Sequence, residues 1–281
     1  MYHRIALATL LFLLLSCNGN QEPTETEGQR PATPAMPEPK SISYQLINAY
    51  PHDTAAFTQG FEIYQGKLLE GTGLINRSSL RRTDLKTGRI LNRINIDSPY
   101  FGEGITVLRD TLYQLTWQNN MVFVYDAKTF RKIREMKWSD EGWGITNDGS
   151  NLYISTGSDK IYVARPSDLK LQRVISVSDP FGLLNNLNEL EWINGFIYAN
   201  RWEYDYILKI DPASGHVLGR IDLKDFLARN AKVDITYLGA PGSIGAQNGA
   251  YLNGIAYDSS SGNLFITGKL WPHVFEIKPA D

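Results

Sequence analysis

Eight polar or aromatic residues occupy equivalent places in five repeats of this chain. They supply one carboxylate, one amine, three carboxamides and three indoles: Glu103, Lys269, Gln59, Asn188, Asn253, Trp117, Trp143 and Trp202. A carboxylate can transfer protons, and amines and amides can stabilise a carbonyl oxygen on which charge develops. Indoles can enclose a small molecule in an apolar wall. The set therefore predicts acid–base chemistry on a small polar substrate.

The repeats are marked by short apolar runs that end at Leu69, Tyr113, Tyr153, Tyr198 and Phe265. The ends of successive runs are 44, 40, 45 and 67 residues apart. A period near 40–45 residues is typical of four-stranded propeller blades. We predict an all-β fold, a five-bladed β-propeller with one insertion before the fifth blade.

The polar residues keep a fixed distance from these landmarks, which places them together. Ten positions before the landmark, or twelve in the fifth repeat, stand Gln59, Glu103, Trp143, Asn188 and Asn253, and four positions after it stand Gly73, Trp117, Gly157, Trp202 and Lys269. The start of one strand and the end of its antiparallel neighbour lie at the same sheet edge. If these are the strands nearest the axis, all ten positions surround one mouth of the central channel. Trp138, Trp192 and Trp271 lie outside this register and are expected to be packing residues.

The fifth repeat is incomplete, because only a third strand, around Val274–Ile277, follows its landmark. The segment Ile42–Ala49 can supply the missing strand, so that an N-terminal strand closes the propeller and leaves no open edge. A helix is expected only within Leu223–Ala231, and the Gly-rich run Gly239–Gly249 is expected to be a surface loop.

The N-terminal residues resemble an export signal, predicted over residues 1–16. The apolar run Ala6–Leu15 is too short to span a bilayer, and it leads into Leu14-Leu15-Ser16-Cys17, which resembles a bacterial lipobox. Cys17 is the only cysteine, so we expect it to be lipidated; an ordinary cleaved signal is the alternative. Residues 17–40 are rich in Pro, Glu and Thr and predict a disordered tether, followed by the propeller over 41–281. The expected product is an exported lipoprotein facing the periplasm or the cell surface.

Several motifs of the chain resemble those of the plant and bacterial glutamine cyclotransferases, in order and over residues 45–278. They include Phe57-Thr58-Gln59-Gly60, Tyr100-Phe101-Gly102-Glu103-Gly104, Asp140-Glu141-Gly142-Trp143-Gly144, Leu187-Asn188-Glu189-Leu190 and Thr267-Gly268-Lys269-Leu270-Trp271-Pro272. The resemblance implies a five-bladed propeller that cyclises N-terminal glutamine to pyroglutamate and releases ammonia, with no cofactor or metal. It implies that Glu103 transfers the proton and that Asn188 and Lys269 contact the reacting carboxamide. It also implies a substrate pocket made by Gln59, Phe57, Trp117, Trp143 and Trp202, and Asn253 is expected beside them.

Two other functions remain open from the residues alone. Glu103, Asn188 and Asn253 are oxygen ligands that a metal-dependent lactonase could use, although Lys269 would compete with the cation. A propeller without enzymatic activity could also present this mouth to a partner.

The charge pattern points away from nucleic acid. The formal net charge is −2, and the small basic group Arg77, Arg81 and Arg82 is expected to be a solvated face. The mature histidines are widely spaced and predict no zinc site. We expect partners to be peptides with N-terminal glutamine and, through Cys17, a lipid bilayer. The propeller itself is expected to be a monomer.

Overall fold

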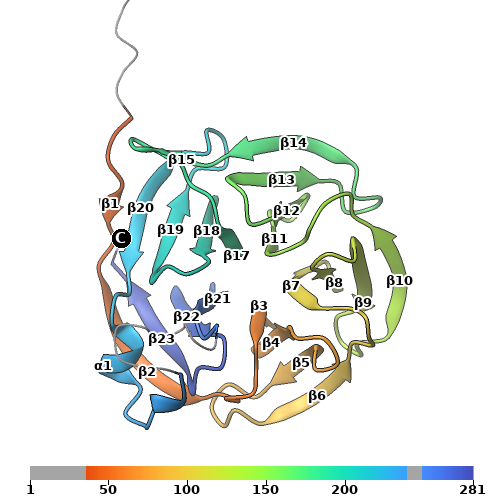
Figure 1. The fold of residues 1–281 in the computed structure, drawn as a ribbon, viewed down its shortest axis with the longest axis horizontal. Coiled ribbons are helices and arrows are strands. Elements are labelled where there is room, and N and C mark those ends of the chain that lie inside the picture. The colour runs from red at the N-terminus through yellow and green to blue at the C-terminus, as the bar shows by residue number, and fades with distance from the viewer. Residues whose placement is uncertain (1–35, 239–248, 281) are drawn as a thin grey trace, which may run out of the picture. The chain divides into compact units, whose positions relative to one another are not determined.

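The computed structural model describes residues 36–238 and 249–280, and these build five antiparallel sheets arranged around a central axis (Figure 1). The prediction of a five-bladed β-propeller is confirmed. No helix in these residues is long and apolar enough to cross a bilayer. The expected signal, lipobox and most of the tether lie outside the described residues, as does the Gly-rich run up to residue 248.

Each blade has four strands, and in the first four blades these run in chain order from the axis outward. The first three blades are β3 (Thr58–Tyr64), β4 (Lys67–Thr72), β5 (Ser79–Thr83) and β6 (Ile90–Asn95); β7 (Gly102–Leu108), β8 (Thr111–Thr116), β9 (Met121–Asp126) and β10 (Lys132–Lys137); and β11 (Ile145–Asn147), β12 (Leu152–Ser155), β13 (Lys160–Ala164) and β14 (Leu171–Ser176). The fourth blade is β17 (Leu187–Ile193), β18 (Phe196–Arg201), β19 (Tyr206–Ile210) and β20 (Val217–Asp222).

The fifth blade combines both ends of the folded region. Its inner strands are β21 (Leu252–Asp258), β22 (Asn263–Gly268) and β23 (His273–Pro279), and β2 (Tyr44–Pro51) pairs antiparallel with β23, Ala49 opposite Phe275. The expected strand over Ile42–Ala49 is thus the outer strand of this blade. Outside the repeat pattern lie β1 (Lys40–Ser41), parallel to β20, and the small hairpin of β15 (Ser178–Asp179) and β16 (Gly182–Leu183). The helix α1 (Phe226–Asn230) falls within the range expected for it, and a 3₁₀ turn follows at Thr236–Leu238.

The hydrophobic core lies between blades. Each of the five buried clusters joins one blade to the next, as Leu69 of β4 and Phe123 of β9 do in the cluster between the first and second blades. Trp138 and Trp271 are buried in two of these clusters and Trp192 packs against a third, so the packing role expected for them is confirmed. Because apolar burial is shared by neighbouring blades, closing the ring stabilises every blade.

The recurring glycine at the start of the inner strands explains how five strands fit around the axis. A Cβ at Gly144 would lie 2.0 Å from the backbone oxygen of Asn188, and one at Gly104 would lie 2.7 Å from that of Trp143. Neither distance is compatible with a side chain, so glycine permits the close approach of neighbouring blades. The residue before each glycine is thereby held at the rim of the channel.

Candidate active site

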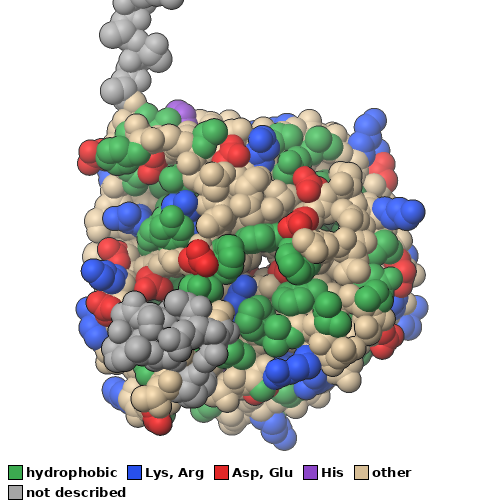
Figure 2. Space-filling view, viewed as in Figure 1, with side chains coloured by type: hydrophobic (Ala, Val, Ile, Leu, Met, Phe, Trp, Pro, Cys, Tyr) green, Lys and Arg blue, Asp and Glu red, His purple; other side chains and the backbone are tan. Residues whose placement is uncertain are grey.

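A cavity of about 350 Å³ opens at one end of the inner strands. Its lining is largely aromatic and includes a carboxylate, two amides and an amine: Phe57, Gln59, Phe101, Glu103, Trp117, Trp143, Asn188, Trp202 and Lys269. Seven of these nine residues belong to the ten positions predicted from the repeats. In Figure 2 hydrophobic side chains gather around a hollow at the centre of the face.

Strand register brings these residues together. Gln59, Glu103 and Asn188 are each the second residue of an inner strand, whereas Trp202 and Lys269 directly follow the second strand of their blades. The ends of these strands pair, as Leu187 with Arg201 and Leu252 with Gly268 show. Residues far apart in the chain therefore meet at one edge, as the repeat alignment predicted.

Three of the ten positions do not line the cavity. A Cβ at Gly73 would lie 2.2 Å from the Phe101 ring, and one at Gly157 would lie 2.6 Å from the Trp143 ring, so both glycines leave room for aromatic side chains. Asn253, expected to contact substrate, is buried behind Gln59. Its Nδ2 donates to Gln59 Oε1 at 3.2 Å and to the Thr58 backbone oxygen at 3.0 Å, so it orients the Gln59 amide.

Glu103 is the only carboxylate among the described residues that line the cavity. Gln59 Nε2 donates to its Oε1 at 2.9 Å, while its Oε2 is buried and has no hydrogen-bond partner among the described residues. Burial raises the pKa of Glu103 well above its usual value, against the opposing effects of Lys269 and the Gln59 hydrogen bond. One carboxylate oxygen is thus left available to a proton from a bound molecule.

Lys269 and Asn188 complete the polar part of the lining. Burial lowers the pKa of Lys269 to about 8, although the nearby Glu103 charge acts in the opposite direction. Its Nζ lies 4.7 Å from the centre of the Phe57 ring, a cation–π contact. Asn188 Oδ1 is buried and has no hydrogen-bond partner among the described residues. An amine and an amide therefore face the space beside Glu103.

Phe101 was missed by the sequence analysis as a site residue, although a signal for it exists. It lies two positions before Glu103, as Phe57 lies two positions before Gln59. Because side chains alternate along a strand, residues two apart point to the same side. Applying the repeat alignment to this second position would have identified Phe101.

The basic group Arg77, Arg81 and Arg82 is not wholly exposed. Arg81 was expected on a solvated face, and this is wrong: it is buried and donates to Asp53 Oδ2 at 2.8 Å. Among the described residues, no three or more His, Cys, Asp or Glu side chains form a group that could hold a metal ion.

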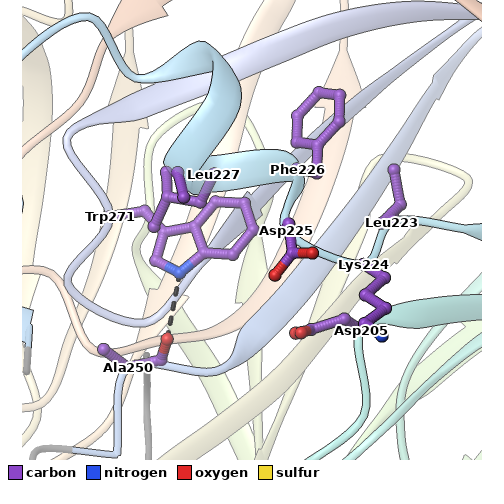
Figure 3. Close-up of a pocket in the computed structure, with 9 residues that line it drawn as sticks. Asp205, Leu223, Lys224, Asp225, Phe226, Leu227, Ala250 and Trp271 are labelled. Carbon is purple, nitrogen blue, oxygen red and sulfur yellow. Dashed lines mark hydrogen bonds between the residues drawn. The ribbon is translucent and has the colours of Figure 1, made fainter. Parts of the chain in front are cut away.

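A smaller cavity of about 150 Å³ lies beside α1 (Figure 3). Trp271 flanks it and donates its indole N–H to the Ala250 backbone oxygen at 3.0 Å. Asp205 and Asp225 also line it, and burial together with the neighbouring Asp225 and Asp222 charges raises the pKa of Asp205. No amine–carboxylate–amide set like that of the mouth is assembled there, so we assign the chemistry to the larger cavity.

Comparison with known proteins agrees with this geometry. The family model described as glutamine cyclotransferase matches residues 13–279. The chain belongs to the glutamine cyclotransferase family. The glutaminyl-peptide cyclotransferase of Arabidopsis thaliana is 39% identical over 237 residues, which cover 83% of this chain and 70% of that protein. The crystal structure of the Myxococcus xanthus glutaminyl cyclase superposes with a TM-score of 0.76 at 34% identity, covering 87% of this chain and all of that one.

Proposed function

We propose that this chain is a glutaminyl-peptide cyclotransferase, which converts N-terminal glutaminyl residues of peptides to pyroglutamyl residues and releases ammonia. The observation that carries the proposal is the buried, half-partnered Glu103 in a cavity that also holds an amine and an amide. Family membership and the similarity to the Arabidopsis and Myxococcus proteins support the same reaction.

The reaction needs a folded substrate more than a strong reagent. The α-amine attacks the side-chain carbonyl carbon of the same residue, a new C–N bond forms, and the bond to the amide nitrogen breaks. A cavity that holds the glutamine side chain bent toward its own amine gains much of the rate from proximity. The aromatic lining excludes water from the bent conformer.

Glu103 is the proposed proton shuttle. Its free Oε2 accepts a proton from the attacking amine and returns it to the departing nitrogen, which leaves as ammonia. The raised pKa of Glu103 suits both steps, because the group must first accept the proton and later release it. Gln59 holds the other carboxylate oxygen and so fixes the direction in which Oε2 points.

Lys269 and Asn188 are proposed to stabilise the carbonyl oxygen as negative charge develops on it. Lys269 supplies charge in a buried setting where hydrogen bonds to ions are strong. Asn188 brings both a donor and an acceptor to the carboxamide, and its Oδ1 has no partner among the described residues to compete.

The test is ammonia release from a glutamine-initiated dipeptide, with and without chelator. We expect chelator-resistant release by the wild type and a loss of about 10³-fold in kcat for Glu103→Gln. A wild type that is folded and releases no ammonia would refute the function. Release that chelator abolishes would favour a metal-dependent enzyme, and lactones would then be the substrates to examine.

We further propose that the chain is an exported, monomeric lipoprotein anchored through Cys17. The support is the lipobox-like Leu14-Leu15-Ser16-Cys17 and the lack of any other cysteine in the chain. Fractionation of cells that express the wild type or Cys17→Ala tests the anchor: we expect only the wild type in the membrane fraction. Equal distribution of the two forms would exclude lipidation as the anchor.

The proposed monomeric state is tested separately, by measuring the molar mass of the soluble form with light scattering. We expect the mass of one chain.

A further inference from the structure

The aromatic lining of the mouth consists of two runs of edge-to-face contacts. In the first run Phe57 contacts Phe101, with ring centres 6.1 Å apart, and Phe101 contacts Trp117 at 5.8 Å. In the second run Trp143 contacts Trp202 at 5.8 Å, and Trp202 contacts Tyr251 at 6.1 Å. The two runs are not linked by a ring contact between Trp117 and Trp143 among those observed in the described residues.

Glu141 fills the place where the two runs meet. Trp117 Nε1 donates to Glu141 Oε2 at 2.9 Å, and Trp143 Nε1 donates to the same oxygen at 3.1 Å. Gln118 Nε2 donates to the other oxygen, Oε1, at 3.0 Å. One carboxylate therefore joins an indole of the second blade to an indole that begins the third.

The residues at the position equivalent to Glu141 are aromatic in three of the other four repeats. Two places before the inner-strand residues stand Phe57, Phe101, Glu141, Asn186 and Tyr251. Three of the five are aromatic and belong to the two runs of rings. In the third repeat a carboxylate stands instead, at the point where the ring contacts are interrupted.

The carboxylate is both ionised and held from behind. Although burial opposes it, the hydrogen bonds from Gln118, Trp143 and Trp117 lower the pKa of Glu141. The buried Trp138 donates its indole N–H to the Glu141 backbone oxygen at 3.2 Å. The Gly142 N–H donates to the Trp117 backbone oxygen at 3.3 Å, so the segment is tied to the core on both sides of the site.

We infer that Glu141 is a positioning residue, whose carboxylate locks Trp117 and Trp143 into one wall and so shapes the pocket for the glutamine side chain. This inference rests on the proposed function. Because both indole N–H groups are already bound, they do not compete for the substrate carboxamide. The carboxamide is then left to Asn188 and Lys269.

Three variants test the inference: Glu141→Ala, Glu141→Gln and the surface control Glu135→Gln. Glu135 lies on the outer strand β10 and pairs with the exposed Lys132. A glutamine carbonyl at 141 can still accept both indole N–H groups, whereas alanine cannot. Each variant is examined by KM and kcat for a glutamine-initiated dipeptide and by the near-ultraviolet circular dichroism of its tryptophans.

We expect Glu141→Ala to raise KM by about tenfold with a smaller effect on kcat, and to change the near-ultraviolet spectrum. Glu141→Gln restores both towards the wild type, and Glu135→Gln matches the wild type. The inference is overturned if Glu141→Ala keeps the wild-type KM and spectrum, or if Glu141→Gln is as impaired as Glu141→Ala. If the wild type itself releases no ammonia, the proposed function fails, and the spectra of the variants still decide whether Glu141 locks the indoles.

Discussion

Two buried carboxylates of this propeller, Glu103 and Glu70, lie near basic groups yet have opposite surroundings. Glu70 receives hydrogen bonds at Oε1 from Thr58 Oγ1 at 2.7 Å and His52 Nε2 at 3.0 Å, and its Oε2 lies 3.9 Å from Arg81. Burial alone would raise the pKa of Glu70, but His52, Arg81 and Thr58 lower it. Glu103 has one partner, a free Oε2 and a raised pKa.

The surroundings of His52, the partner of Glu70, favour its charged form. His52 Nδ1 lies 2.8 Å from the Trp271 backbone oxygen and Nε2 lies 3.0 Å from the Glu70 carboxylate, so both ring nitrogens face acceptors. Burial would lower the pKa of His52, but Glu70 and the backbone acceptor raise it. The comparison teaches that this fold satisfies a carboxylate where it needs stability and leaves one unsatisfied where a substrate must bind.

The largest effect on the Glu103 side of the comparison, after loss of Glu103 itself, is expected from Lys269. Lys269→Met removes the buried charge beside the reacting carbonyl and should lower kcat by about 10²-fold. Since burial lowers the pKa of Lys269 to about 8, wild-type kcat should fall as pH rises through that value. Steady-state kinetics from pH 6 to 10 measure both effects.

Lys269→Arg sharpens that prediction, because a guanidinium stays charged throughout this range. Its residual activity should lack the alkaline decline. A decline near pH 8 that persists in Lys269→Arg would assign the titration to another group.

On the Glu70 side, Glu70→Gln should destabilise the protein by about 3–5 kcal/mol, because it leaves the buried His52 without its carboxylate partner and leaves Arg81 with Asp53 alone. Denaturant unfolding measures the change. The contribution of this pair to stability depends on pH in two ways. The contribution of Glu70 is lost as pH falls through its lowered pKa, and the contribution of His52 is lost as pH rises through its raised pKa. If Glu70→Gln is as stable as the wild type at pH 6, Glu70 does not have the stabilising role that distinguishes it from Glu103.

The smallest expected effect lies further along the channel, at the partly buried Glu62, which accepts the Val107 N–H at 2.8 Å. Burial raises its pKa to about 8. The folded state therefore favours the protonated form, and stability is lost as pH rises from the ordinary value towards 8. Glu62→Gln should raise Tm at pH 9 and leave it unchanged at pH 4. Equal shifts at both pH values would contradict this origin.

The sequence could predict the blades and the mouth for one physical reason. Inner strands repeat, so a fixed distance from a landmark becomes a fixed place at the rim, as the positions of Glu103 and Lys269 show. The hairpin β15–β16 and the strand β1 have no counterpart in the other repeats, and a short polar segment carries no periodic signal.

The burial of Arg81 could not be predicted from the sequence. Arg81 stands directly opposite Glu70 on neighbouring strands, and that pairing buries it. In the sequence it is one of three arginines close together, which usually indicates an exposed face. The role of Glu141 could not be predicted from the sequence either. It depends on two indole N–H groups that donate to one carboxylate oxygen only in the folded chain.

The most direct test of the contrast measures ammonia release and thermal unfolding on the same samples of Glu103→Gln and Glu70→Gln. We predict that Glu103→Gln loses turnover and keeps or raises its Tm, because it removes an unsatisfied buried acid. Glu70→Gln should have a lower Tm than the wild type, while the molecules that remain folded keep the wild-type kcat. A Glu103→Gln protein that unfolds more easily than Glu70→Gln, or that still cyclises glutamine at the wild-type rate, would contradict the account.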